Sequence, residues 1–413
     1  MAKARKDNRG RALRKGESQR ASDLSYIYTY TDPFGKRKYI YAKDLPTLRE
    51  KEDILKKDQL DGLDVYAAGN STLNFVFDRY MSTKYDLRAT TKANYAYMYN
   101  HFVRDGFGMK KIADIKYSDV NYFYYYLLND RGLQANTVDT IHTILHPTFQ
   151  LAVRDQIIRI NPSSGLMAEI KRKAGKNKGI RHALTLEQQR AFMNYTSKNP
   201  VFYHWWPLFT VLLGTGCRIG EVVGLRWEDL NFENRLISIN HSVTYYQRSI
   251  DRKGKSDFAV SLPKTAAGIR TVPMMDAVYD ALQMEYEAQK ENGFNSTVID
   301  GMTGFVFYNR FGNIHNPQTV NRTIKRVLEN HNAEETLNAK KERRQPIIIP
   351  NFSCHHLRHT FCTRFCENET NLKVIQSVMG HANIETTMDI YAEATDIKKK
   401  EAIENLSRNL NVF

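Results

Sequence analysis

The sequence predicts a multidomain α+β protein, and its length, composition and pattern all point that way. The chain has 413 residues, which at about 150 residues per domain corresponds to about three domains, each able to bury an apolar core. Its 42% hydrophobic and 25% charged residues are typical of globular proteins and exclude disordered, collagen-like and coiled-coil chains. A formal net charge of +15 indicates a polyanionic partner, and nucleic acid is the first candidate.

The first domain is expected over residues 1–66, as a small basic sheet with a helix. Aromatic and β-branched residues flank the DPFG segment at residues 32–35, which predicts a β-hairpin over residues 24–42. Residues 46–58 place apolar side chains among charged ones and predict a weakly amphipathic helix that covers one sheet face. A two-stranded ribbon fits a major groove about 12 Å wide, so we expect the cations beside the turn to contact DNA: Lys36, Arg37 and Lys38.

The second domain, over residues 71–168, is expected to be all helical, with most of its aromatic side chains in the core. A basic linker follows over residues 169–181. Its KRKAGKNKGIR segment carries six positive charges and no acidic residue, which is typical of a cationic tether that does not fold alone. We expect the tether to lie near DNA phosphates through Lys171, Arg172, Lys173, Lys176 and Lys178.

The third domain, over residues 182–413, has a mixed α+β pattern. Helices are expected near 185–196 and 201–213 and after Gly216, strands around 235–247 and 258–263, and helices from there to the end. The last segment, 392–413, predicts an amphipathic helix. Its apolar side packs either on its own domain or on a neighbouring subunit, and the pattern leaves both open.

Two features bear on the compartment. No stretch approaches the roughly 18 consecutive apolar residues that a spanning helix needs, and the basic N-terminus lacks a signal-peptide core, so we expect a cytoplasmic protein without a membrane partner. The cysteines are few and clustered in the C-terminal half, which favours reduced thiols over a disulfide framework; they are Cys217, Cys354, Cys362 and Cys366.

Two cations stand out in the third domain. Arg218 lies in the first turn of a predicted helix, where a guanidinium is unfavourable for the helix dipole but well placed to bind an anion. A surface ion pair with Glu221 is the competing interpretation. Lys264 lies near the tip of a predicted strand-turn-strand segment, and taken alone it would be an ordinary solvated hairpin charge.

Two His-containing segments follow. In FSCHHLRHTFC, residues 352–362, helical spacing makes His355 and Arg358 neighbours one turn apart, with Thr363 expected to point outward. A zinc site competes here because Cys and His are crowded together, but one straight helix cannot surround an ion tetrahedrally. Farther on, His381 follows Gly380 at a helix end, where its ring can face a cleft; Tyr391 lies ten residues later.

These segments, in this order, resemble the tyrosine recombinase (phage integrase) family, and specifically the integrases of conjugative transposons. The resemblance rests on TGCR at 215–218, a hairpin lysine, HHLRHT at 355–360, GH at 380–381 and a downstream tyrosine. It implies that the three domains bind arm DNA, bind core DNA and catalyse recombination. It also implies six catalytic residues: Arg218, Lys264, His355, Arg358, His381 and Tyr391.

The chemistry asks for the same residue types. Two guanidinium groups can bind the non-bridging oxygens of a phosphodiester under attack, Tyr391 can act as nucleophile with His355 as base, and Lys264 can protonate the leaving 5′-oxygen while His381 hydrogen-bonds the phosphate. We therefore expect a site-specific recombinase without cofactor or metal. Its expected partners are double-stranded DNA at core and arm sites, three further copies in a homotetramer, and an accessory excision factor.

Two other functions compete with this interpretation. A type IB topoisomerase needs the same side chains and acts as a monomer. A non-catalytic architectural DNA-binding protein explains the charge and the three domains, but it leaves the six-residue pattern as coincidence.

Overall fold

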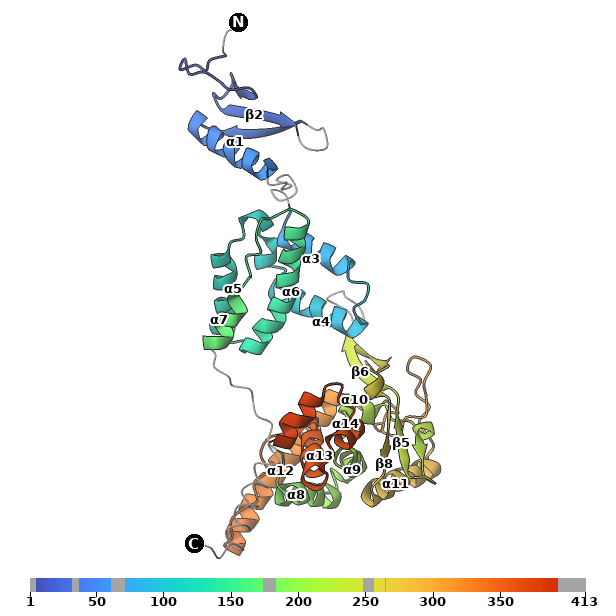
Figure 1. Ribbon diagram of the computed structural model, residues 1–413. Coiled ribbons are helices and arrows are strands. Elements are labelled where there is room, and N and C mark those ends of the chain that lie inside the picture. Colours follow the sequence, from blue (N-terminus) through green and yellow to red (C-terminus); the bar gives the residue numbers. More distant parts are fainter. Residues whose placement is uncertain are drawn as a thin grey trace, which may run out of the picture. The chain divides into compact units, whose positions relative to one another are not determined.

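The computed structural model describes residues 5–31, 37–60, 71–173, 183–247, 256–263 and 265–392 (Figure 1). The described residues form two compact units, one before residue 174 and one after residue 182. The first unit contains two hydrophobic clusters, one before residue 60 and one after residue 71. The mixed helix-and-strand fold class predicted from the sequence is confirmed.

The N-terminal part is a three-stranded antiparallel sheet with one helix. Its strands are β1 (Glu17–Gln19), β2 (Tyr26–Thr31) and β3 (Arg37–Ala42), in the order β1-β2-β3, and helix α1 (Leu45–Leu60) follows. The predicted hairpin and helix are confirmed, and β1 is an addition. Successive β3 side chains alternate between faces: Ala42 is buried with Leu48 of α1, whereas Tyr39 and Tyr41 are more than half exposed.

The second part of the first unit is helical. It consists of α3 (Leu73–Ser82), α4 (Ala89–Phe102), α5 (Tyr117–Asn129), α6 (Ala135–Arg154) and α7 (Leu166–Lys173). The aromatic side chains divide more evenly between the core and the surface than expected. Tyr99, Phe123 and Tyr124 are buried in the cluster, whereas Tyr97 and Tyr122 are more than half exposed.

Helix α7 corrects the predicted linker, because it continues to Lys173, where the tether was expected to begin at residue 169. Lys173 pairs with Glu169 at 2.8 Å and Lys171 with Asp139 of α6 at 2.9 Å. Cations in a last helical turn also interact favourably with the helix dipole. Lys171, Arg172 and Lys173 therefore belong to a helix end.

The second unit combines helices with a small sheet and a hairpin. The sheet has the order β4-β5-β8, with β4 (Leu230–Asn231), β5 (Leu236–Ile239) and β8 (Arg270–Pro273), and the hairpin pairs β6 (Ser242–Gln247) with β7 (Ser256–Ser261). The helices are α8 (Leu186–Lys198), α9 (Trp206–Thr215), α10 (Ile219–Val223), α11 (Asp276–Asn292), α12 (Pro317–Glu342), α13 (Cys354–Asn368) and α14 (Leu372–Met379).

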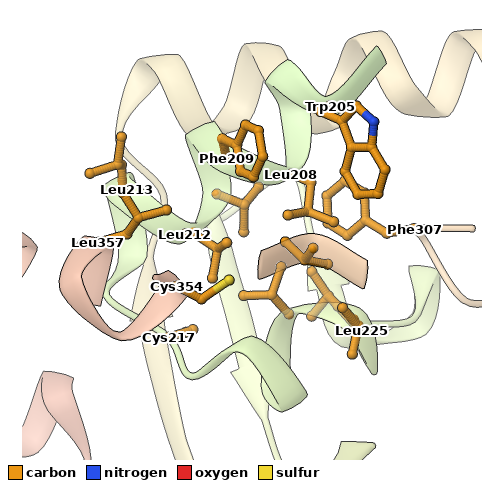
Figure 2. Packing of buried hydrophobic residues seen from close by; sticks show 14 of the residues in the cluster. Trp205, Leu208, Phe209, Leu212, Leu213, Cys217, Leu225, Phe307, Cys354 and Leu357 are labelled. Atoms are coloured by element: carbon orange, nitrogen blue, oxygen red, sulfur yellow. The ribbon is translucent and has the colours of Figure 1, made fainter. Parts of the chain in front are cut away.

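Helix α9 lies at the centre of this unit. Phe209 and Leu212 are fully buried, and they share one hydrophobic cluster with Cys354 and Leu357 from the first turn of α13 (Figure 2). This packing fixes the C-terminal end of α9 relative to the start of α13. Two residues of the candidate active site lie here: Gly216, which ends α9, and Arg358, which follows Leu357.

Candidate active site

Three of the sequence-predicted catalytic residues come together in the second unit. Arg358 donates hydrogen bonds to the carbonyl oxygens of Gly216 at 2.7 Å and Met379 at 2.6 Å. Arg218 donates to the carbonyl oxygen of Gly380 at 3.3 Å, one residue before His381. The turn after α9, helix α13 and the turn after α14 thus meet at one place.

Two left-handed glycines shape this meeting point. Gly216 ends α9 with φ of 62° and Gly380 ends α14 with φ of 63°, a conformation that favours glycine. A Cβ atom on Gly216 would lie 2.3 Å from Cδ1 of Phe361, and one on Gly380 would lie 2.9 Å from Nη1 of Arg270. The glycines therefore allow backbone carbonyls and guanidinium groups to approach closely.

Arg218 is partly exposed and binds a buried acid, Glu221. Its side chain is 43% exposed, its Nη1 donates to Oε1 of Glu221 at 3.0 Å, and its backbone N–H donates to Oε2 at 2.8 Å. The competing interpretation of a surface ion pair is wrong in one respect, because Glu221 is buried and also binds Arg270. Arg218 keeps an accessible guanidinium that can bind an anion.

Arg358 is a buried cation. Burial, with the nearby positive charge of Arg218, lowers the pKa of Arg358 to about 10, so it stays protonated at neutral pH. For Glu221, burial opposes ionisation, but hydrogen bonds from Arg270 bring its pKa below the usual value. The guanidinium groups of Arg218 and Arg270 both bind this carboxylate. Arg358 instead donates to backbone carbonyls, so three cations lie near one acid and the site is strongly positive.

His381 is buried and neutral. Its Nδ1 lies 3.0 Å from the hydroxyl oxygen of Thr387, which is also buried, and its backbone N–H donates to the carbonyl oxygen of Gln376. Burial, with the charges of Arg358 and Arg218, lowers the pKa of His381 to about 4. With Nδ1 engaged by Thr387, Nε2 is the nitrogen left to interact with a ligand.

The remaining two described candidates lie on adjoining elements. His355 is exposed in the first turn of α13, three residues before Arg358 and on the same helix face. Tyr391 lies in a helical segment over 384–392, and its side chain packs against a cluster from α13 and α14 that includes Cys362, Cys366 and Met379. The helices that hold Arg358 and Gly380 therefore also hold the segment that carries the tyrosine.

Helix α13 corrects one predicted orientation. Thr363, expected to point outward, is 4% exposed, because α13 is covered on more than one face. All four cysteines are buried and free of disulfides: Cys217, Cys354, Cys362 and Cys366. Burial raises the pKa of Cys354 to about 12. Among the described residues, no three His, Cys, Asp or Glu side chains gather as metal ligands.

Several predicted contacts lie outside the described residues: Lys36, Lys176, Lys178, Lys264 and the helix expected over 392–413, of which only residue 392 is described. Arg37 and Lys38 begin β3. Within the described ranges, no helix is long and apolar enough to cross a membrane. The sequence interpretation missed Thr387, which contacts His381. It also missed Arg270, which binds Glu221, the acid that holds Arg218.

Comparison with known proteins identifies the family. The phage integrase family model matches residues 182–397, which is more than half of the chain. The chain belongs to the phage integrase family of tyrosine recombinases. A model of the DNA-binding domain of Tn916 integrase matches residues 1–59.

Individual members of the family are similar over most of this recombinase. The transposase from transposon Tn916 of Enterococcus faecalis is 31% identical over 408 residues, which cover 96% of this chain and 95% of that protein. The structure of the Tn1549 transposon integrase in complex with transposon right-end DNA has a TM-score of 0.66 at 27% identity, and the match covers 82% of this chain and 100% of that one. A lambda integrase dimer bound to a core site, 18% identical with a TM-score of 0.51 over 92% of this chain and 95% of that one, shares the fold.

The buried neutral His381 predicts a pH dependence of stability. In the unfolded chain this imidazole takes up a proton near pH 6.5, whereas in the folded chain it stays neutral down to about pH 4. Its contribution is fully present above pH 6.5 and is lost as the pH falls toward 4. We expect about 3 kcal/mol of the free energy of unfolding to be lost over this window.

Denaturation followed by tryptophan fluorescence measures this effect, because Trp205, Trp206 and Trp227 all lie in the second unit. His381→Asn should reduce the difference in the free energy of unfolding between pH 7 and pH 4.5. An unchanged difference in the variant would show that His381 does not titrate in this way.

Proposed function

We propose that this tyrosine recombinase is the integrase of a mobile element, cutting and rejoining DNA through a 3′-phosphotyrosyl intermediate. The observation that carries the proposal is the convergence of Arg218, Arg358 and the turn before His381, which places two guanidinium groups and a neutral imidazole at one site. That combination suits the phosphate of a DNA strand under attack. The similarity to the Tn916 and Tn1549 proteins supports a transposon as the element.

The proposed reaction uses six side chains. The hydroxyl oxygen of Tyr391 attacks phosphorus and its proton passes to His355. The bond from phosphorus to the 5′-oxygen breaks, and that oxygen takes a proton from Lys264. Arg218 and Arg358 bind the non-bridging oxygens, whose negative charge grows in the transition state, and His381 donates a hydrogen bond to one of them. The phosphotyrosyl bond preserves the energy for rejoining.

Tyr391→Phe tests the nucleophile. The variant lacks the attacking oxygen, so we expect no covalent protein–DNA adduct on a suicide substrate, while the affinity for the same DNA stays within about twofold because Phe keeps the ring packing. Adducts are detected by denaturing gel electrophoresis. A matched control is Tyr203→Phe, which removes a hydroxyl from an exposed tyrosine of the same unit. Adducts formed by Tyr391→Phe would end the assignment.

Lys264→Ala tests the general acid. We expect cleavage of ordinary DNA to be slower by about 100-fold. A substrate whose leaving 5′-oxygen is replaced by sulfur should largely restore the rate, since a thiolate leaves without protonation. Equal defects on both substrates would make Lys264 a binding residue and require another acid.

The division of DNA contacts is also part of the proposal. The sheet of the first 66 residues is proposed to bind distal arm sites, while the helical domain and the catalytic unit bind the core site, in the cytoplasm and as a homotetramer aided by an accessory excision factor. The match of residues 1–59 to the Tn916 integrase DNA-binding domain supports this arrangement. It also favours recombination over a type IB topoisomerase, whose monomeric action needs no second DNA site.

Charge reversal at the start of β3 tests the arm-site contact. We expect Arg37→Glu with Lys38→Glu to weaken arm-DNA binding and to reduce the slope of log affinity against log salt by about 2, one unit for each lost phosphate contact. Core-site cleavage should be unchanged. Lys57→Glu, on the exposed side of α1, is the control for changed net charge. Normal arm binding by the β3 variant would assign this sheet another role.

A further inference from the structure

Arg270, the first residue of β8, is a buried cation that none of the proposed catalytic steps uses. Its side chain is only 4% exposed, and its guanidinium group forms an ion pair with a buried carboxylate. A buried guanidinium is tolerated only when its donors are paired. The identity of those partners therefore indicates what the residue does.

The partners of Arg270 lie on the segments that carry the catalytic residues. Nη2 donates to Oε2 of Glu221 at 2.8 Å and Nη1 to Oε1 at 3.2 Å, so the two side chains form a two-pronged ion pair. Nε donates to the carbonyl oxygen of Val378 at 2.8 Å, and Nη1 lies 3.4 Å from that of Gly268. Nη2 also lies 3.6 Å from the sulfur of Cys217.

Each of these partners binds a proposed catalytic residue or lies within a few residues of one in the sequence. Glu221 is the carboxylate that binds both the side chain and the backbone N–H of Arg218. Val378 precedes His381 by three residues. Gly268 follows Lys264 by four residues and ends the helical turn Ala266–Gly268. One guanidinium thus connects the turn of Arg218, the turn of His381 and the helical turn Ala266–Gly268, which follows Lys264 in the sequence.

We propose that Arg270 is a positioning residue for phosphate activation. It holds the Glu221 carboxylate so that the guanidinium of Arg218 faces the phosphate, and it holds the carbonyl of Val378 so that the turn bearing His381 keeps the same distance from that phosphate. The fork of Arg270 is essential to this role, because an ammonium group cannot hold both carboxylate oxygens and a separate carbonyl in fixed directions. The proposal rests on the phosphate-binding roles proposed for Arg218 and His381.

The test compares Arg270→Lys with the wild-type protein on two suicide substrates at saturating DNA. We expect cleavage of the ordinary phosphodiester to be slower by about 100-fold, because small misplacements of charge-stabilising groups have effects of that size. In the second substrate a methylphosphonate replaces the scissile phosphate. This group lacks one negative charge, so correct aiming of Arg218 matters less, and we expect the variant to cleave within about 10-fold of the wild-type rate.

Glu221→Gln is the second variant and acts through the same contacts. We expect its cleavage of the methylphosphonate to be less impaired than its cleavage of the ordinary phosphodiester. The double variant Arg270→Lys with Glu221→Gln should be about as slow as the slower single variant, because the effects of substituting residues that act as one unit do not add. Arg226→Lys is the matched control. Arg226 is 13% exposed and pairs with the buried Asp229 at 3.4 Å, so its loss perturbs a similar ion pair elsewhere in the unit.

The outcomes separate the possibilities. The positioning role would be overturned if Arg270→Lys cleaved both substrates at the wild-type rate, or if it were equally slow on both. In the second case Arg270 would have only a structural role. An equal defect in Arg226→Lys would show that loss of a buried ion pair is enough to cause it. Failure of the wild-type protein to form any Tyr391-dependent adduct would instead contradict the proposed function. Preferential recovery of Arg270→Lys on the methylphosphonate supports the inference.

Discussion

The site depends on one constraint: guanidinium groups are buried in it, and each of them needs hydrogen-bond acceptors from the protein. Arg270 and Arg358 are each less than 9% exposed, and charges at such depth require partners. The partners are largely backbone carbonyls at or near the C-terminal ends of α9 and α14, including those of Gly216 and Met379. Such carbonyls lack partners within their own helix and lie at its negative end. Two helix ends thereby become a receptor for cations.

The two halves of the site are supported by different hydrophobic clusters. Leu357 of α13 packs into the large cluster around α9, which fixes Arg358 next to Gly216. Tyr391 and Met379 belong to a smaller cluster formed with Cys362 and Cys366 on the opposite part of α13. Arg358, proposed to bind phosphate, is therefore anchored by the main core, whereas the segment of the proposed nucleophile packs on the other side of the same helix. Helix α13 is the element that connects them.

Sequence patterns predict the local structure and the site residues that carry a recognisable motif. The hairpin around residues 32–35, helix α1 and the mixed third domain follow from periodicity and turn residues. The errors come from distant contacts: Lys171 pairs with Asp139 across two helices, and β1 contains Glu17, which is fully buried because Arg49 of α1 binds it. Neither pairing is visible in a local pattern.

Arg270 shows what the pattern could have revealed. It shares the inward face of β8 with Val272, which is buried, whereas Thr271 and Pro273 are exposed. A cation at an inward strand position requires a buried carboxylate, and Glu221 lies in a helix that already carries Arg218. The alternation of β8 thus indicates a buried ion pair, but only the structure shows which acid is used.

In the proposed reaction, the charge balance of the site favours a transition state over a bound substrate. Arg218 and Arg270 bind the carboxylate of Glu221, whereas Arg358 is held by the carbonyls of Gly216 and Met379, so three fixed positive charges share one nearby acid. A phosphodiester in the ground state brings one negative charge, which offsets part of the excess. During attack by a tyrosine oxygen, further negative charge develops on the non-bridging oxygens, and the fixed guanidinium groups meet it without reorganising. Groups that interact more strongly with the transition state than with the substrate accelerate the reaction itself. In the proposed arrangement, the ion pair between Arg270 and Glu221 fixes the carboxylate that in turn holds the partly exposed guanidinium of Arg218.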